Sequence, residues 1–264
     1  MPFSSRKDSI SANPSETANP VSLKPGLPLV VALGEKTRWY KEHQNEAYYR
    51  RAKKEGYRAR SAYKIQQIHE RFTVVRKGEA VADLGAAPGG WSQVLVELVG
   101  PEGLVVGVDL QRIRPIPGAT FMQGDFTQKA TQERLSAILA DKGRSDLDAV
   151  VSDMAPEMSG NYELDQVRSV QLAEMALGFA DRHLRKGGAF ACKVFEGADF
   201  PEFRAEVKRR FKRMHQYHPA ASRKSSSEVY IIGKHYLGAD AGAPTTDDED
   251  EAPLSRAGML DAPS

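Results

Sequence analysis

The sequence predicts an α/β protein, built as a mostly parallel sheet with helices on both faces. Short apolar runs alternate with helix-like segments from residue 79 onward, and several of these runs end in aspartate or glycine. Strands that are separated by helices pair in parallel rather than as hairpins. Because ligands bind such sheets beyond the carboxyl ends of the strands, the residues that follow each strand are the first candidates for chemistry.

Six runs are predicted to be strands, at residues 80–85, 104–110, 119–125, 148–154, 187–195 and 228–236. Helical patterns lie at residues 91–100, 163–184 and 203–211. A further helix is expected at residues 61–72, where Ser61 can cap the amino end. In that helix Tyr63, Ile65 and Ile68 share one face and are expected to point inward.

The chain is expected to fold as one domain between two ends without fixed structure. Residues 1–35 are rich in serine, proline and asparagine and show no periodicity, so they are expected to be disordered. The acidic tail at 238–264 is expected to be disordered for the same reasons. Residues 36–237 then form the single domain, and its first part, 36–77, is predicted to be a basic helical segment.

Composition excludes several classes of protein. No apolar run approaches the roughly 20 residues that span a bilayer, and the amino terminus lacks the apolar core of a secretory signal. The one cysteine, Cys192, can form neither an internal disulfide nor a thiolate metal cluster. The histidines show no metal-ligand spacing. We therefore expect a cytoplasmic protein with no membrane association and no bound metal.

A net charge of +2 conceals a strong asymmetry along the chain. Residues 36–77 contain 13 basic and 4 acidic residues, and residues 204–224 contain 8 basic and 1 acidic. The tail at 238–264 has the opposite balance, with 7 acidic residues and 1 basic. A single charge run usually marks a solvated helix face. Two runs, the first with interleaved tyrosines and a tryptophan, favour a nucleic-acid partner, because cations neutralise phosphates and aromatic rings stack on bases.

A glycine-rich turn follows the first predicted strand, in the run from Asp83 to Trp91. Glycines let the backbone approach a ligand, and the amino end of the next helix favours negative charge. The run matches neither the dinucleotide fingerprint nor the P-loop. Asp109 ends the second strand, where an acid bonds ribose hydroxyls, and Asp125 ends the third, where a carboxylate can accept from an adenine amino group. Together these residues predict a ligand that contains adenosine.

The run DLGAAPGGWSQ (83–93) resembles the cofactor motif of the FtsJ-like RNA ribose methyltransferases. Further motifs of that family are EGYRARSAYKI at 55–65, VSDMAP at 151–156, FACKVFEG at 190–197 and RKSSSEVYIIG at 223–233. The resemblance spans residues 53–236 and implies a Rossmann-like S-adenosylmethionine-dependent methyltransferase fold. That fold has a mostly parallel, seven-stranded sheet with an antiparallel last strand. The resemblance also implies a cofactor pocket lined by Gly89, Trp91, Asp109, Asp125 and Asp153.

The family uses a Lys-Asp-Lys-Glu tetrad, and each member occurs here within its motif. By resemblance the tetrad consists of Lys64, Asp153, Lys193 (the proton acceptor) and Glu228. The chemistry suits these residue types, because a ribose hydroxyl is a poor nucleophile that needs alignment and removal of its proton. A lysine acts as a base only when burial or a second cation lowers its proton affinity. Lys193 lies within an apolar strand, where a lysine is unusual.

The resemblance implies methylation of a ribose 2′-hydroxyl, with a uridine in the A-loop of large-subunit (23S) ribosomal RNA as the leading target. The expected partner is ribosomal RNA within the large subunit, and the protein is expected to be a monomer. A transfer-RNA or cap ribose methyltransferase is an alternative, because related families share the tetrad. A ribosome-assembly RNA-binding protein with a vestigial cofactor site is another, although both motifs are intact. A small-molecule methyltransferase would not need two basic segments.

Overall fold

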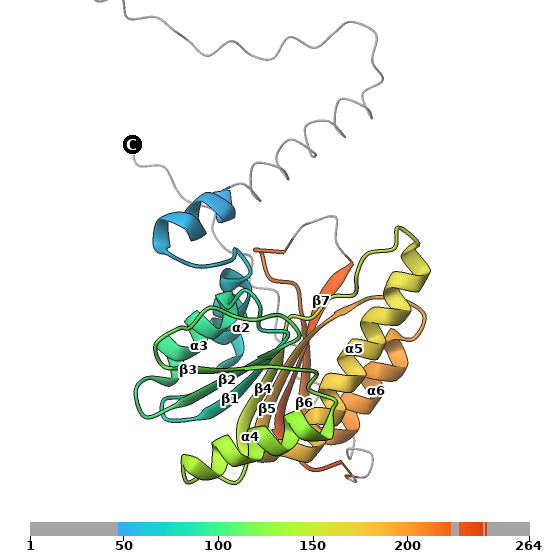
Figure 1. The fold of residues 1–264 in the computed structure, drawn as a ribbon. Coiled ribbons are helices and arrows are strands. Elements are labelled where there is room, and N and C mark those ends of the chain that lie inside the picture. The colour runs from blue at the N-terminus through green and yellow to red at the C-terminus, as the bar shows by residue number, and fades with distance from the viewer. Residues whose placement is uncertain (1–46, 223–226, 240, 242–264) are drawn as a thin grey trace, which may run out of the picture. The chain divides into compact units, whose positions relative to one another are not determined.

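The computed structural model describes residues 47–222, 227–239 and 241 (Figure 1). Residues 1–35, the start of the basic segment and most of the acidic tail lie outside the described residues, and so do the predictions made for them. Residues 47–55 are helical, in line with the predicted basic helical segment. The helices that follow are α2 (Ala62–Phe72), α3 (Gly90–Val99), α4 (Lys129–Asp141), α5 (Tyr162–His183) and α6 (Phe200–Arg210).

Seven strands form one sheet in the order β3-β2-β1-β4-β5-β7-β6. Their bounds are β1 (Ala80–Leu84), β2 (Leu104–Asp109), β3 (Ala119–Gln123), β4 (Leu147–Ser152), β5 (Leu184–Phe195), β6 (Phe211–Tyr217) and β7 (Glu228–Tyr236). Strands β1 to β5 pair in parallel, whereas β7 is antiparallel to both of its neighbours, β5 and β6. The predicted fold class, a mostly parallel seven-stranded sheet with an antiparallel last strand, is confirmed.

All six strands predicted from apolar runs are present, but β6 and helix α4 were not predicted individually. Strand β6 is an edge strand, and four of its seven residues are cationic or polar (FKRMHQY). Because an edge strand has one partner and one open side, its sequence does not need the apolar run that marks a central strand. Helix α4 buries only Thr131, Leu135 and Leu139, a narrow stripe that gives a weak periodic signal.

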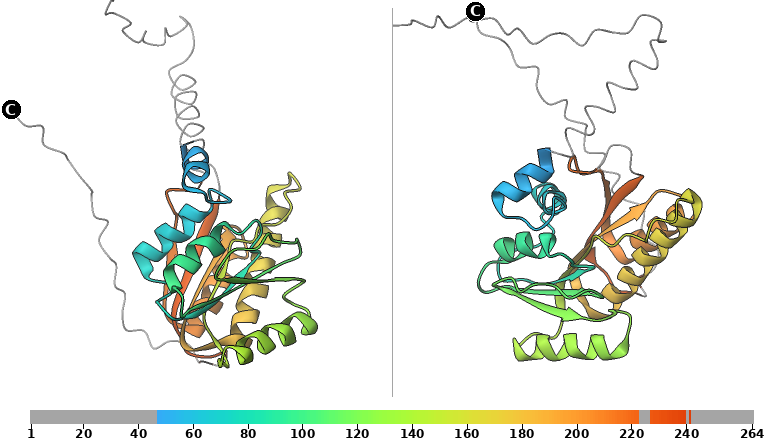
Figure 2. Two further views of the ribbon diagram at one scale, coloured as in Figure 1. Left: turned by 60° about the vertical axis from the view of Figure 1, so that its left-hand side comes forward. Right: turned by 45° about the horizontal axis from the view of Figure 1, so that its top comes forward.

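Helices cover both faces of the sheet, as predicted (Figures 1 and 2). Within β1, Ala82 and Leu84 pack with α4, α5 and α6, while Val81 packs with α2 and α3. This alternation follows from the period of two along a strand. The sheet therefore separates two apolar clusters, and α2 lies on the same face as α3.

Helix α2 carries Lys64 and is oriented by its apolar residues. Tyr63, Ile65 and Ile68 are at most 2% exposed, which confirms the predicted inward face. The prediction that Ser61 caps this helix through its side chain is wrong, because Ser61 has helical backbone angles and makes no side-chain cap hydrogen bond. Its carbonyl instead accepts from the indole N–H of Trp91 at 2.9 Å. That bond fixes α2 against the start of α3.

None of the helices in residues 47–222 and 227–239 is both long and apolar enough to span a membrane. Across the same residues, no group of three or more His, Cys, Asp or Glu side chains is arranged to hold a metal ion.

Candidate active site

Four charged side chains predicted to act together meet at the carboxyl end of the sheet. Lys193 Nζ lies 2.6 Å from the carbonyl oxygen of Asp153 and 3.1 Å from its Oδ1. Lys64 Nζ lies 2.6 Å from Glu228 Oε1 and 3.9 Å from Asp153 Oδ1. The two lysines thus share the Asp153 carboxylate, and the predicted tetrad forms one connected cluster.

Strand register explains why these residues meet. Ser152 and Cys192 are partners in the parallel pair β4–β5, so Asp153 leaves β4 beside Lys193. Lys193 comes two residues after Ala191 and therefore lies on the same face of β5. Ala191 packs in the apolar cluster that the sheet forms with α2 and α3. The lysine side chain therefore emerges on the face that α2 covers, where Lys64 is held. Glu228 is the first residue of β7, two residues before Tyr230, the cross-strand partner of Lys193.

The tetrad is largely shielded from water. The side chains of Lys193 and Lys64 are 7% and 9% exposed, and those of Glu228 and Asp153 are 12% and 17% exposed. Burial alone would raise the pKa of Asp153, but Lys193 and Lys64 outweigh it and lower this pKa below the usual value. Asp153 is therefore a stable carboxylate that can hold two ammonium groups in fixed positions.

Tyr230 is a further member of the cluster that was not predicted. Its hydroxyl donates to Asp153 Oδ1 at 2.5 Å, and its ring lies 5.6 Å from Lys64 Nζ, in cation–π range. Burial, followed by the charges of Asp153 and Glu228, raises the pKa of Tyr230 well above its usual value, so the hydroxyl stays protonated. The sequence feature that could have identified Tyr230 is its position two residues after Glu228, which puts both side chains on the same face of the strand.

The glycine-rich turn lies next to the tetrad, between β1 and α3. Gly89 precedes α3 with φ 108°, a left-handed conformation that favours glycine. At Gly85, where φ is 73°, a Cβ would come within 2.4 Å of Met154 Cγ, so the turn packs directly against the residue after Asp153. The first backbone N–H groups of α3, at Gly90 and Trp91, point out of the helix without an intrahelical acceptor. This turn can receive a polar ligand beside the tetrad.

The two predicted acids at strand ends organise the loops around them. Asp109 accepts from the N–H of Ala87 through Oδ2 at 2.9 Å and from the N–H of Gln111 through Oδ1 at 2.7 Å. Asp125 accepts through Oδ1 from the N–H and the hydroxyl of Thr127, at 2.8 and 2.7 Å. Those bonds lower the pKa of Asp125 below its usual value. Since a carboxylate oxygen has two lone pairs, each acid can still accept from a ligand.

Leu110 adds a feature that sequence reasoning missed. It directly follows Asp109 and is 70% exposed, the most exposed of the large apolar side chains in the described residues. An exposed apolar side chain beside a carboxylate is a suitable surface for a flat base. The turn, the two acids and Leu110 together fit a ligand that contains adenosine.

The ring of Trp91, which was predicted to line the cofactor pocket, is buried. Its side chain is 3% exposed, it bonds Ser61, and it stacks on Tyr230 with ring centroids 5.8 Å apart. Any contact of Trp91 with a ligand at the turn would therefore come from its backbone. The Trp91 ring instead supports Tyr230, which bonds Asp153, and helix α2, which carries Lys64.

Asp83, at the end of β1, is a buried acid without a cation. It is 1% exposed, and its Oδ2 accepts from the Ser92 hydroxyl at 2.6 Å, while Oδ1 has no hydrogen-bond partner among the described residues. Burial raises the pKa of Asp83 to about 7, with smaller contributions from the charges of Asp153 and Asp109. The sequence marked Asp83 only as the start of the turn motif.

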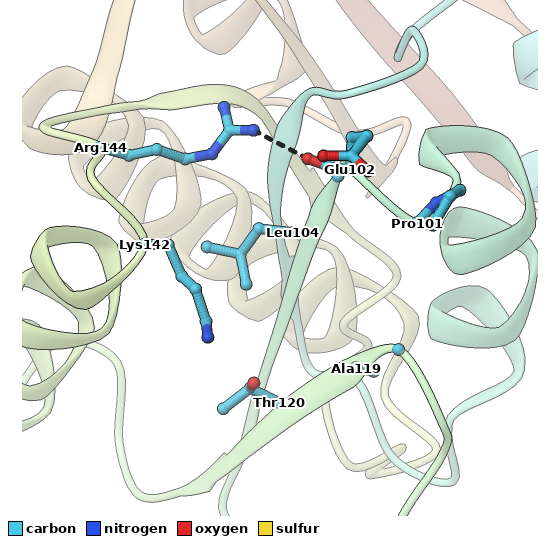
Figure 3. Close-up of a pocket in the computed structure, with 9 residues that line it drawn as sticks. Pro101, Glu102, Leu104, Ala119, Thr120, Lys142 and Arg144 are labelled. Carbon is cyan, nitrogen blue, oxygen red and sulfur yellow. Dashed lines mark hydrogen bonds between the residues drawn. The ribbon is translucent and has the colours of Figure 1, made fainter.

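A separate pocket of about 450 Å³ lies at the amino ends of β2 and β3, away from the tetrad (Figure 3). In it the Arg144 guanidinium donates to the carbonyl of Glu102 at 3.2 Å, and the Lys142 side chain extends from the same side toward Thr120. The sequence predicted no function for the residues that line it. The candidate active site is at the opposite, carboxyl end of the strands.

Comparisons with known proteins show the family of the chain. The sequence profile of the FtsJ-like methyltransferase family matches residues 57–236. The chain belongs to that family. It is 52% identical over 196 residues to the "Ribosomal RNA large subunit methyltransferase E" of Methanothrix thermoacetophila, with 74% of each chain covered. With the protein of that name from Acinetobacter baumannii it shares 46% identity, over 74% of this chain and 89% of the other.

A solved structure shows the same fold. A Plasmodium falciparum protein, described as a ribosomal RNA methyltransferase, superposes with a TM-score of 0.63 and 28% identity. The match covers 69% of this chain and all of that one. Family membership therefore rests on sequence, on fold and on the intact motifs, and methyl transfer is the chemistry that the family supports.

Proposed function

We propose that this FtsJ-like methyltransferase transfers a methyl group from S-adenosylmethionine to a ribose 2′-hydroxyl of ribosomal RNA. The specific target we propose is a uridine in the A-loop of the large-subunit RNA. The observation that carries the proposal is the connected cluster of Lys64, Asp153, Lys193 and Glu228 beside a glycine-rich turn. The relatives named as large-subunit ribosomal RNA methyltransferases support the choice of RNA.

The residues around the turn would hold the cofactor. Gly89 and the backbone of Trp91, at the amino end of α3, would bind its methionine part. Asp153 would contribute from the other side, because Met154, the next residue, packs against Gly85 of the same turn. Asp109 would bond the ribose hydroxyls, and Asp125 the adenine amino group. When bound, the cofactor supplies a methyl group on a positively charged sulfur, which leaves as a neutral thioether.

Lys193 is the proposed proton acceptor. Asp153 engages its Nζ through two oxygens, so one tetrahedral position of the nitrogen is left for the acceptor hydroxyl. Lys193 Nζ would receive the proton of the ribose hydroxyl during methyl transfer. Lys64, 3.9 Å from the same carboxylate, shares the negative charge of Asp153 with Lys193.

The remaining members of the cluster fix geometry. Glu228 holds Lys64 at 2.6 Å, and Tyr230 donates to the carboxylate that both lysines share. A network in which every charge has a partner keeps its side chains in single positions. That order matters because alignment of the attacking oxygen contributes several orders of magnitude to such reactions.

The acceptor is proposed to bind across the exposed cations of the helical segment that precedes α2. Lys53 and Lys54 are exposed there, and cations of this kind bind phosphates without reading sequence. We propose that the protein works as a monomer in the cytoplasm on RNA within the large subunit. Selection of one uridine would then come from the shape of the subunit around the A-loop.

The test is a methyl-transfer assay with labelled S-adenosylmethionine and three acceptors. These are large ribosomal subunits lacking the modification, naked large-subunit RNA, and total transfer RNA. We expect label in the large-subunit RNA, mapped to a 2′-O-methyl uridine of the A-loop, and none with Lys193→Ala. Label in transfer RNA alone would favour the alternative acceptor. Binding of RNA without transfer to any acceptor would favour a vestigial site.

A further inference from the structure

Arg58 lies in the basic segment, but its side chain points to the cofactor turn. Its Nη1 donates to the carbonyl of Pro88 at 3.1 Å and to that of Arg114 at 2.6 Å, and its Nη2 donates to the carbonyl of Pro115 at 2.7 Å. Pro88 belongs to the turn after β1, and Arg114 and Pro115 belong to the connection after β2. One guanidinium therefore joins the two loops that flank the proposed cofactor site.

The contact is close because the turn contains glycine at two successive positions. A Cβ at Gly89 would come within 3.1 Å of Arg58 Nη1, and a Cβ at Gly90 within 3.2 Å of Ala59 Cβ. The same segment is held from α3 by Gln93, which accepts from the Arg58 N–H at 2.8 Å and donates to the Gly56 carbonyl at 3.0 Å. Backbone and side chain of Arg58 are thus fixed by different partners.

We propose that Arg58 is a positioning residue for S-adenosylmethionine, which holds the turn at Pro88–Gly89 and the connection at Arg114–Pro115 in the shape that receives the cofactor. This inference rests on the proposed function for the identity of the ligand. A planar guanidinium can bridge three carbonyl oxygens in fixed directions, whereas the ammonium of lysine cannot. Arg58 therefore works through the loops and does not touch the reacting atoms.

The obvious alternative for an arginine in a basic segment is a phosphate contact. In this structure carbonyl oxygens take three of the five N–H groups of the Arg58 guanidinium, so Arg58 has fewer donors to offer a phosphate than an unbonded arginine has. Lys54, four residues earlier and exposed, has no such restraint and is the better candidate for a phosphate. The two cations are close in sequence but are expected to affect different ligands.

The experiment measures S-adenosylmethionine affinity by calorimetry on the full-length protein without RNA. Arg58→Ala is expected to weaken it about tenfold or more, since three hydrogen bonds to the loops are lost. Arg58→Lys is expected to recover only part of that loss. Gln93→Ala is the matched control, because it removes two bonds to the same segment and leaves the three carbonyl contacts intact. Its affinity should stay within about threefold of the wild type.

Steady-state kinetics supply the second readout. Arg58→Lys is expected to raise the KM for the cofactor, while kcat at saturation and the KM for RNA stay near wild type. Lys54→Ala is expected to raise the KM for RNA and to leave the KM for the cofactor near wild type. The proposal is overturned if Arg58→Ala binds the cofactor as the wild type does, or if Gln93→Ala loses as much affinity. Failure of the wild type to bind S-adenosylmethionine would instead overturn the proposed function.

Discussion

The carboxylates at the ends of β1 and β4 lie on neighbouring strands and are held in opposite ways. Asp153, after β4, is surrounded by Lys193, Lys64 and the Tyr230 hydroxyl, and its pKa is lowered. Asp83, near the end of β1, accepts from the Ser92 hydroxyl, and burial raises its pKa to about 7. The difference divides the carboxyl end of the sheet into a proposed catalytic part, whose carboxylates pair with lysines, and a proposed cofactor part, where Asp83 bonds a hydroxyl group instead.

The same division holds for the acids of the cofactor part. Asp109 and Asp125 accept from backbone N–H groups of the surrounding loops, whereas Asp153 and Glu228 bind side-chain ammonium groups. Bonds to the backbone shape a turn, and bonds between side chains place reactive groups. Substitutions in the two parts should therefore affect different quantities.

The largest effect is expected at Lys193. Lys193→Ala should lower turnover by about 10²–10⁴-fold, the contribution of a positioned base, while cofactor affinity changes little. Lys193→Arg should be nearly as inactive, because a guanidinium stays protonated and has a different shape. Single-turnover transfer and calorimetry measure the two quantities separately. Wild-type turnover in Lys193→Arg would show that a fixed positive charge suffices and would exclude the base.

Asp109 and Asp125 should differ from Lys193 and from each other. Asp109→Ala frees the N–H of Ala87 in the glycine-rich turn, so both a ligand contact and the shape of the turn are lost. We expect cofactor affinity to fall about tenfold or more, equivalent to about 1–3 kcal/mol. Asp125→Ala frees only groups of Thr127 and should cost less. Equal or reversed losses by calorimetry would contradict the division between turn and adenine contacts.

The sequence identified the four charged members of the cluster but not every contact between them. Lys193 stood out because a lysine within the apolar run AFACKVF is rare, and the family motifs supplied Lys64, Asp153 and Glu228. Tyr230 was not predicted, since a tyrosine in an alternating strand is usually ordinary core. Its role appears only when strand pairing places it opposite Lys193. Pairing between distant strands is not visible in local periodicity.

Strands were predictable from the sequence where burial requires an apolar run. Strands with an open side need no such run and were harder to predict. Central strands such as LVVGVD are apolar up to their last residue, whereas the edge strand FKRMHQY has an open side and no such apolar run. The charge of the basic segment was equally ambiguous. Counting cations could not separate Lys54, which faces solvent, from Arg58, which bonds three carbonyls.

The contrast between Asp83 and Asp153 predicts opposite effects on stability. Asp83 has a raised pKa of about 7, so between about pH 4 and 7 the folded protein binds a proton that the unfolded chain releases. Stability is therefore lost as pH rises through this range. Asp83→Asn should remove that loss and gain about 1 kcal/mol or more at pH 8 relative to pH 5.

For Asp153 the sign is reversed, because its pKa is lowered and the ionised form stabilises the fold above the unfolded value. Asp153→Asn should destabilise the protein at both pH 5 and pH 8, since both lie above that value. Urea unfolding without cofactor at the two pH values measures both variants. If the stability difference between Asp83→Asn and the wild type were the same at pH 5 and pH 8, Asp83 would be ionised in the same way in both states.

The smallest effect is expected for surface cations, which also divide into exposed and ion-paired groups. Lys53 and Lys54 are exposed, whereas Arg209 and Arg210 bond Glu206, and Arg210 also bonds Asp181 at 2.9 Å. Replacing Lys53 and Lys54 by glutamine should lower RNA affinity at low salt and make the dependence of log K on log salt shallower by about one to two. The same change at Arg209 and Arg210 should leave that slope unaltered and lower the melting temperature, because Glu206 and Asp181 lose their partners. Filter binding at several salt concentrations, with a melting curve for each variant, separates the two pairs. A shallower slope for the arginine pair would mean that these ion pairs open to RNA, and an unchanged slope for the lysine pair would make the helical segment only a solvated surface.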